Sequence, residues 1–168
     1  MSTLDVSVAF CHRRNPGETQ HWMFILAIPG STTGTWYHVT GGPTLQAGYT
    51  LHIQAGKRLD SFGIASRTVL CQISANDINK VRAAAQAVPL QRCQRWTVAL
   101  LDRLEQRGLV PLGTKVRFES QIEPSPHEQR SSGGSQAGGG NGSNHLGSRS
   151  ASSYPSSGTR SSYFPSRS

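Results

Sequence analysis

Hydrophobic and polar residues alternate along the first part of the chain with the two-residue period that is typical of β-strands. Turn signals made of Pro, Gly and Asn separate the alternating segments. One segment, "HWMFILAI", is apolar after its first residue, which indicates a central strand with both faces buried. The pattern predicts strands at residues 4–13, 21–28, 35–40, 49–55 and 66–73.

The period changes to that of an α-helix after residue 74. Ser74 and Asp77 resemble a capping box in front of "INKVRAAAQAV", a segment that Pro89 closes. A longer helix is predicted in "LQRCQRWTVALLDRLEQRG", which Gly108 is placed to end. One face of this helix collects apolar residues at steps of three or four, namely Cys93, Trp96, Leu100 and Leu104.

The order of these elements, strands first and helices afterwards, indicates an α+β domain, a small antiparallel sheet with two helices. The segment "LVPLGTKVRFE" predicts one last strand. From about residue 120 the chain is rich in Ser, Gly, Arg and Pro, with almost no aliphatic side chains, so it cannot bury enough apolar area to offset the entropy of ordering. We therefore expect a folded domain over 1–119 and a disordered tail over 120–168.

The formal net charge of +8 is spread along the chain, with no cationic run longer than "HRR" at 12–14. A basic surface can attract nucleic acid, anionic lipid or acidic protein, or simply be solvated. No nucleic-acid-binding motif accompanies the charge, so we do not expect a nucleic-acid partner. The start of the chain lacks the pattern of a signal peptide, and no apolar stretch nears the ~20 residues that span a bilayer. We expect a cytoplasmic or nuclear protein, not secreted and without a transmembrane segment.

Three cysteines, Cys11, Cys71 and Cys93, are odd in number for a disulfide framework and too widely spaced for a zinc motif. We therefore expect no metal and no other cofactor. Cys71 alternates with apolar residues, which indicates a buried position in a strand. Cys11 and His12 are neighbours in a predicted strand, so their side chains point to opposite faces and do not pair.

Cys93 differs from the other two because it lies at the start of the long helix, with Arg92 and Arg95 beside it. A helix N-terminus and nearby guanidinium groups both favour thiolate over thiol, and the thiolate is the nucleophile. On this hypothesis the pKa of Cys93 falls below its usual ~8.5. The alternative is that Cys93 is a small buried residue on the apolar helix face.

A cysteine nucleophile needs a base, and a third group that holds the base in the right tautomer. His21 and His38 offer both roles, because they lie on the two arms of a predicted hairpin. Each histidine alone is compatible with a purely structural place in the sheet. The loop between the strands does not fix their register, so the sequence leaves open whether the two side chains share a face.

The segments "QHWMFILAIPG", "YHVTGG" and "QRCQRWTVALLDRLEQRG" resemble the permuted papain-like (NlpC-type) cysteine enzymes. This group includes lecithin retinol acyltransferase and the H-Ras-suppressor-like phospholipase/acyltransferases. In it a His-Trp pair opens a strand, a second His lies on the next strand, and a Cys opens a helix. The resemblance implies that Cys93 attacks an acyl carbon, that His21 is the base, and that His38 orients or polarises His21.

The resemblance covers residues 20 to 110 and has departures. Arg92 replaces the Asn that precedes the cysteine in those enzymes, and "QRW" replaces Glu-His-Phe. A polar tail stands where the phospholipase branch has a membrane anchor. The chain is more similar still to a short fungal family with the same His-Trp and Cys-Gln-x-Trp signatures.

Three functions are compatible with these patterns. The first is a cysteine hydrolase or acyl/peptidyl transferase of permuted papain-like fold, which forms an acyl-enzyme on an unknown small-molecule, lipid or peptide substrate. The second is a non-catalytic binding module of the same fold. The third is a basic nucleic-acid-associated protein, although the tail has neither an RGG repeat nor an aromatic platform. The sequence does not define an oligomeric state.

Overall fold

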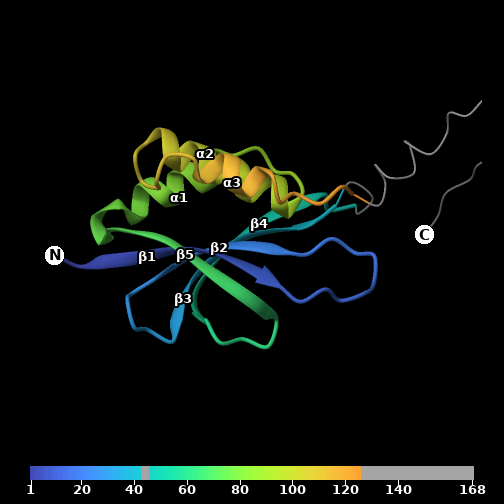
Figure 1. Ribbon diagram of the computed structural model, residues 1–168, viewed down its shortest axis with the longest axis horizontal. Helices are drawn as coiled ribbons and strands as arrows, with labels where there is room; N and C mark the ends of the chain where they lie inside the picture. Colours follow the sequence, from blue (N-terminus) through green and yellow to red (C-terminus); the bar gives the residue numbers. More distant parts are fainter. Residues whose placement is uncertain (43–45, 126–168) are drawn as a thin grey trace, which may run out of the picture. The chain divides into compact units, whose positions relative to one another are not determined.

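The computed structural model describes residues 1–42 and 46–125 (Figure 1). The strands form one antiparallel sheet in the order β4-β3-β2-β1-β5, and the helices lie on one side of it. This arrangement confirms the α+β class and the small antiparallel sheet. The elements are β1 (Thr3–Cys11), β2 (Trp22–Ala27), β3 (Thr33–Gly41), β4 (Tyr49–Arg58), β5 (Ile64–Ser74), η1 (Ala75–Asp77), α1 (Ile78–Ala87), α2 (Cys93–Gln106) and α3 (Thr114–Glu119).

The sheet is curled. Strands β4 and β5 lie at opposite edges, yet only residues 59–63 connect them. In a flat sheet the two edges would be about four strand spacings apart, roughly 19 Å. The connection is also hydrogen-bonded to other turns, since Leu59 N–H donates to Thr32 O at 2.9 Å and His12 N–H donates to Gly63 O at 2.9 Å. Leu59 and Ile64, at the two ends of this connection, pack on the same small core of Ala9, Met23 and Ile25, so the sheet bends around that core.

Strand β2 runs through the middle of the sheet, as its apolar sequence predicts. All six of its residues are buried. Alternate side chains serve two cores: Trp22 and Phe24 belong to the main core beneath the helices, and Met23 and Ile25 to a smaller core on the other face. A strand that is buried on both faces reads as a continuous apolar run, which explains why it lacks alternation.

Helix α2 buries the face that its periodicity predicts. Trp96, Leu100 and Leu104 have no exposed surface. Gly108 ends the helix with a positive φ of 68°, and Leu109 N–H returns to Leu104 O at 2.9 Å. This is the backbone closure that a glycine after a helix permits.

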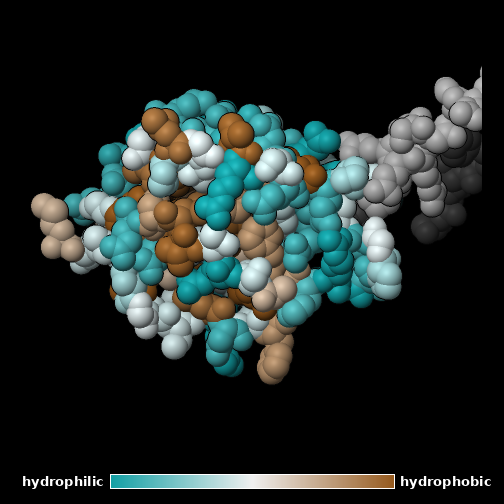
Figure 2. Space-filling model, viewed as in Figure 1, coloured by the Kyte–Doolittle hydropathy of each residue, from teal (hydrophilic) through white to brown (hydrophobic). Residues whose placement is uncertain are grey.

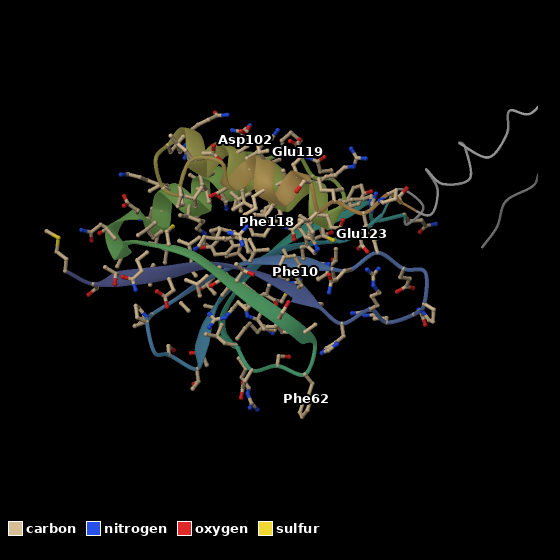
Figure 3. The ribbon with its side chains drawn as sticks, in the orientation of Figure 1. Phe10, Phe62, Asp102, Phe118, Glu119 and Glu123 are labelled. Atoms are coloured by element: carbon tan, nitrogen blue, oxygen red, sulfur yellow. The ribbon has the colours of Figure 1, made fainter. Side chains whose placement is uncertain are left out.

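The last predicted strand, within "LVPLGTKVRFE", is wrong. The segment contains the short helix α3 instead. Glu105 of α2 caps it, because its carboxylate accepts hydrogen bonds from the backbone N–H of Gly113 at 2.9 Å and of Lys115 at 2.8 Å. A cap supplied by a distant side chain leaves no signal in local sequence. Phe118 then packs into the main core and stacks on Phe10 of β1, with ring centroids 6.2 Å apart (Figure 3).

The chain continues to pack against the domain beyond residue 119, where composition placed the start of the tail. Ile122 contacts the main core and Ser125 is buried. The carboxylate of Glu123 accepts from the backbone N–H of Gln20 at 2.7 Å. The predicted disordered tail from residue 126 onwards lies outside the described residues. Among the helices in 1–42 and 46–125, none is long and apolar enough to cross a membrane.

Exposed apolar side chains are scattered over the domain. Figure 2 shows hydrophobic residues in small groups among hydrophilic ones on the face that it presents. Phe62, at the tip of the β4–β5 connection, points away from the sheet (Figure 3). Leu112 is exposed in the connection between α2 and α3. Such isolated exposure is normal for a folded domain.

Trp96→Ala should destabilise the domain by about 3–5 kcal/mol, because it empties a fully buried aromatic position. Trp96→Phe should cost less, since it keeps most of the volume and removes an indole N–H that is buried without a hydrogen-bond partner. Chemical denaturation monitored by circular dichroism measures both. The exposed Gln106→Ala is the control and should change the free energy of unfolding by no more than about 0.5 kcal/mol. Equal stability of Trp96→Ala and the parent would contradict the packing of α2.

Two truncations should behave differently. A chain that ends at residue 125 should melt like the full chain. A chain that ends at residue 119 loses Glu123 and with it two hydrogen bonds of the buried Gln94 amide, which should destabilise it by about 1–3 kcal/mol. Thermal melts of the two truncated chains provide the test. A lower melting temperature for the 1–125 chain would mean that later residues also stabilise the domain.

Candidate active site

The Cys93 thiol lies against the segment that leads into β2. Cys93 is the first residue of α2, and its Sγ donates to the carbonyl oxygen of Gln20 at 4.0 Å. The backbone N–H of Trp22 also interacts with the sulfur. Since Gln20 and Trp22 flank His21, the structure places Cys93 against the backbone on either side of the histidine predicted as its base.

A buried amide holds these two segments together. Gln94, 1 % exposed, follows Cys93 in α2. Its Nε2 donates to Gln20 O and to Glu123 Oε2, both at 2.8 Å, and its Oε1 accepts from Glu123 N–H at 2.8 Å. An ion pair with Arg13 further fixes Glu123. The start of α2 is thus tied to the entry of β2, and Cys93 is fixed with it.

The two histidines share one face of the sheet. In the β2–β3 register Phe24 lies opposite Tyr37, so His21 and His38 are diagonal neighbours across the strand pair. His21 Nε2 and His38 Nδ1 are 3.1 Å apart in a hydrogen bond, with the rings nearly perpendicular at 78°. The register that the sequence left open therefore places the two predicted histidines in contact.

Both imidazoles are neutral at pH 7. Burial, and secondly the charge of His38, lower the pKa of His21 to about 4. Burial also lowers the pKa of His38, although Gln54 opposes this through a side-chain hydrogen bond. Desolvation disfavours the imidazolium, and two adjacent imidazoles disfavour a second charge. A neutral His21 can accept a proton.

The expectation of a low Cys93 pKa is wrong. Burial raises the pKa of this thiol, and this effect outweighs the backbone N–H groups of Trp22 and Gln94 and the charge of Arg92, all of which lower it. Local sequence reveals the cationic neighbours of a cysteine but not the depth at which the sulfur lies. Cys93 is therefore a protonated thiol that lines the same cleft as a neutral imidazole.

The site opens into a cleft of about 870 Å³. Cys93, His21 and His38 all line it. One part of its wall is apolar and is formed by Met23, Trp36, Val39, Tyr49 and Ile64. Basic residues line another part, namely His12, Arg13, Arg14 and Arg92, with Glu18 as the acidic residue among the described lining groups. The cleft could hold a ligand with apolar and polar ends.

One residue near the site, His52, escaped the sequence analysis, and Cys11, which that analysis set aside, lies there as well. His52 lies opposite His38 in the β3–β4 register, with ring centroids 5.1 Å apart, and its Nε2 is hydrogen-bonded to Thr40 Oγ1 at 2.7 Å. The sequence signal for His52 was its place between Leu51 and Ile53 in a predicted strand. Cys11 also lines the cleft, and burial, then the proximity of Cys93, raise its pKa to about 11.

Cys71 lies elsewhere. Its Sγ donates to Leu109 O at 3.5 Å beneath the helices, and it does not line the cleft. Within residues 1–42 and 46–125, no group of three or more His, Cys, Asp or Glu side chains is arranged to hold a metal ion.

Comparison with known proteins gives one match. No curated protein and no solved structure matches the chain. A model described as a family of unknown function (DUF6540) matches residues 8–111, a range that includes His21, His38 and Cys93. The chain therefore belongs to the DUF6540 family.

Proposed function

We propose that the protein is a cysteine-dependent hydrolase or acyl/peptidyl transferase, with Cys93 as the nucleophile, His21 as the base and His38 as the positioning residue. The observation that carries the proposal is the 3.1 Å contact between His21 and His38 on a cleft that Cys93 shares. A structural sheet histidine has no need of a second histidine and a helix-heading thiol beside it. The substrate is an acyl compound whose carbonyl carbon reaches Cys93 through the cleft.

The fold proposal is the permuted papain-like one. Its support is the chain order: His21 directly precedes β2, His38 lies in the adjacent strand β3, and the later Cys93 opens the helix α2. The N-terminus of this helix packs against the entry of β2.

The hydrogen bond between the histidines is compatible with the tautomer that the reaction needs. His21 Nε2 is engaged by His38, so Nδ1 is the ring nitrogen left for the thiol. If His21 Nε2–H donates to His38 Nδ1, then Nδ1 of His21 carries a lone pair. His38 thereby holds His21 in the form that accepts a proton, which is the role of the third group in a cysteine triad.

The reaction then proceeds in two steps. Cys93 Sγ attacks the acyl carbon while its proton passes to His21 Nδ1. The imidazolium returns that proton to the leaving group as its bond to the acyl carbon breaks, which leaves a thioester on Cys93. Water or an amine, deprotonated by His21, attacks the thioester and releases the thiol. Because the pKa of His21 is low, the imidazolium is a strong acid toward the leaving group.

Cys93 should react with iodoacetamide at pH 7.5 faster than Cys11 or Cys71, because His21 can accept its proton. His21→Ala should slow this reaction about tenfold or more, the scale of general-base assistance. His38→Ala should slow it less, since His38 acts through His21. Mass-spectrometric labelling rates for each thiol provide the measurement.

The matched control is His12→Ala, which removes an exposed histidine from the same cleft and should leave the rate unchanged. If Cys93 proved the slowest of the three thiols and insensitive to His21, it would be a structural residue. The non-catalytic binding module would then be favoured.

The pKa of His21 predicts a pH dependence of stability. The folded-state pKa of about 4 lies below the usual ~6.5, so between these values the unfolded chain binds more protons. The free energy of unfolding should therefore fall as pH decreases from about 6.5 to 4. His21→Gln should flatten this slope, whereas the exposed His12→Gln should not. Urea denaturation at a series of pH values measures the slope, and an NMR titration midpoint of His21 near 6.5 would contradict its burial.

A further inference from the structure

One arginine that lines the cleft has no partner among the residues that the structure describes. Arg13 and Arg14 both follow β1 and line the cleft. Arg13 is engaged, because its Nη1 donates to Glu18 O at 2.6 Å and its other amino group pairs with Glu123. In the part of the chain that the structure describes, Arg14 makes neither a hydrogen bond nor an ion pair.

The charge of Arg14 reaches the reacting groups. It lowers the pKa of both His21 and Cys11, which line the same cleft. Electrostatic interactions of this kind fall off with distance and are screened beyond about 10 Å in salt solution. Because His21 and Cys93 line the same cleft as Arg14, a ligand bound there lies within range of this guanidinium, while the charge of Arg92 acts on the Cys93 thiol itself.

The acidic groups nearby do not neutralise Arg14. Glu123 is committed to Arg13 and to the amide of Gln94. Glu18, which lines the cleft, accepts from Asn15 Nδ2 at 2.7 Å within its own turn. The cleft thus combines an unpaired cation with an apolar wall. In that wall the indole N–H of Trp36 is a further buried donor without a partner.

We propose that the acyl substrate carries an anionic group, a carboxylate or a phosphate, which Arg14 binds while the acyl carbon lies at Cys93. This inference rests on the proposed function for the scissile bond. It assigns a binding residue to the part of the substrate that is not cleaved. A guanidinium presents its donors in a fork that matches both kinds of oxyanion, and a partner-free arginine in a cleft is placed to do so.

Two alkylating reagents that differ in charge provide the test. Iodoacetate is an anion and iodoacetamide is neutral, and both react with a cysteine by the same displacement of iodide by sulfur. The ratio of the two labelling rates at Cys93 reports the local potential, because effects on thiol protonation cancel. This ratio should be higher at Cys93 than at Cys71, and it should fall as sodium chloride is added, since salt screens the attraction.

Arg14→Gln should lower the ratio at Cys93 about fivefold, the order expected for one nearby unit charge. Arg14→Lys should restore most of it. The matched control is Arg103→Gln on α2, which removes an arginine that does not line the cleft and should leave the ratio unchanged. An unchanged ratio in Arg14→Gln would overturn the anion site while Cys93 remained a nucleophile. Failure of Cys93 to react in a manner dependent on His21 would instead overturn the proposed function.

Competition separates the two anions. Acetate and methyl phosphate are the probes, each added at the ionic strength of a chloride reference. We expect at least one of them to slow labelling of Cys93 by iodoacetate more than chloride does, and the stronger competitor identifies the group. If neither anion slows the reaction beyond chloride, Arg14 contributes only a diffuse potential and the binding site is refuted.

Discussion

The buried amide of Gln94 is the contact on which the arrangement of the site depends. It joins three segments that are distant in sequence: the start of α2, the entry of β2 and the segment around Glu123. A buried amide must satisfy each donor and acceptor, so this network tolerates little displacement of any of the three. Cys93 and His21 each lie next to a member of the network. Their juxtaposition is therefore a property of the core and not of a surface loop.

The sequence predicted the parts of the fold that depend on periodicity. The apolar run of β2 and the helical spacing of Trp96, Leu100 and Leu104 both correspond to buried faces in the structure. The candidate site residues could also be found from the sequence, because Cys93, His21 and His38 are unusual residue types for their positions in the predicted helix and strands. The local sequence shows which residue types lie at the ends of the predicted strands and helices.

Features that arise from contacts between distant residues were not predictable. Helix α3 forms where a strand was expected because Glu105 caps it from another helix. Glu123 lies in a segment of tail-like composition, yet it binds Gln94 inside the domain. The pKa of Cys93 depends on burial, which its neighbours in sequence do not reveal. In the first two cases the deciding side chain is at least eight residues away in the sequence. In the third case the deciding factor is the exclusion of water from the thiol.

The curled sheet has a consequence for the order in which the domain can assemble. Strand β1 pairs with β2, close in sequence, and with β5, some sixty residues later, as in the pair of Ser7 with Val69. Pairings of such high contact order close slowly, because the loop entropy is lost before the contact is gained. The β1–β4 meander can form early from local hairpins, and α2 packs on two of its strands, β2 and β3, whereas the pairing of β1 with β5 closes later. The helix that carries the cysteine therefore packs on the strands next to the histidines without needing β5, and the thiol can meet the imidazoles before the sheet is complete.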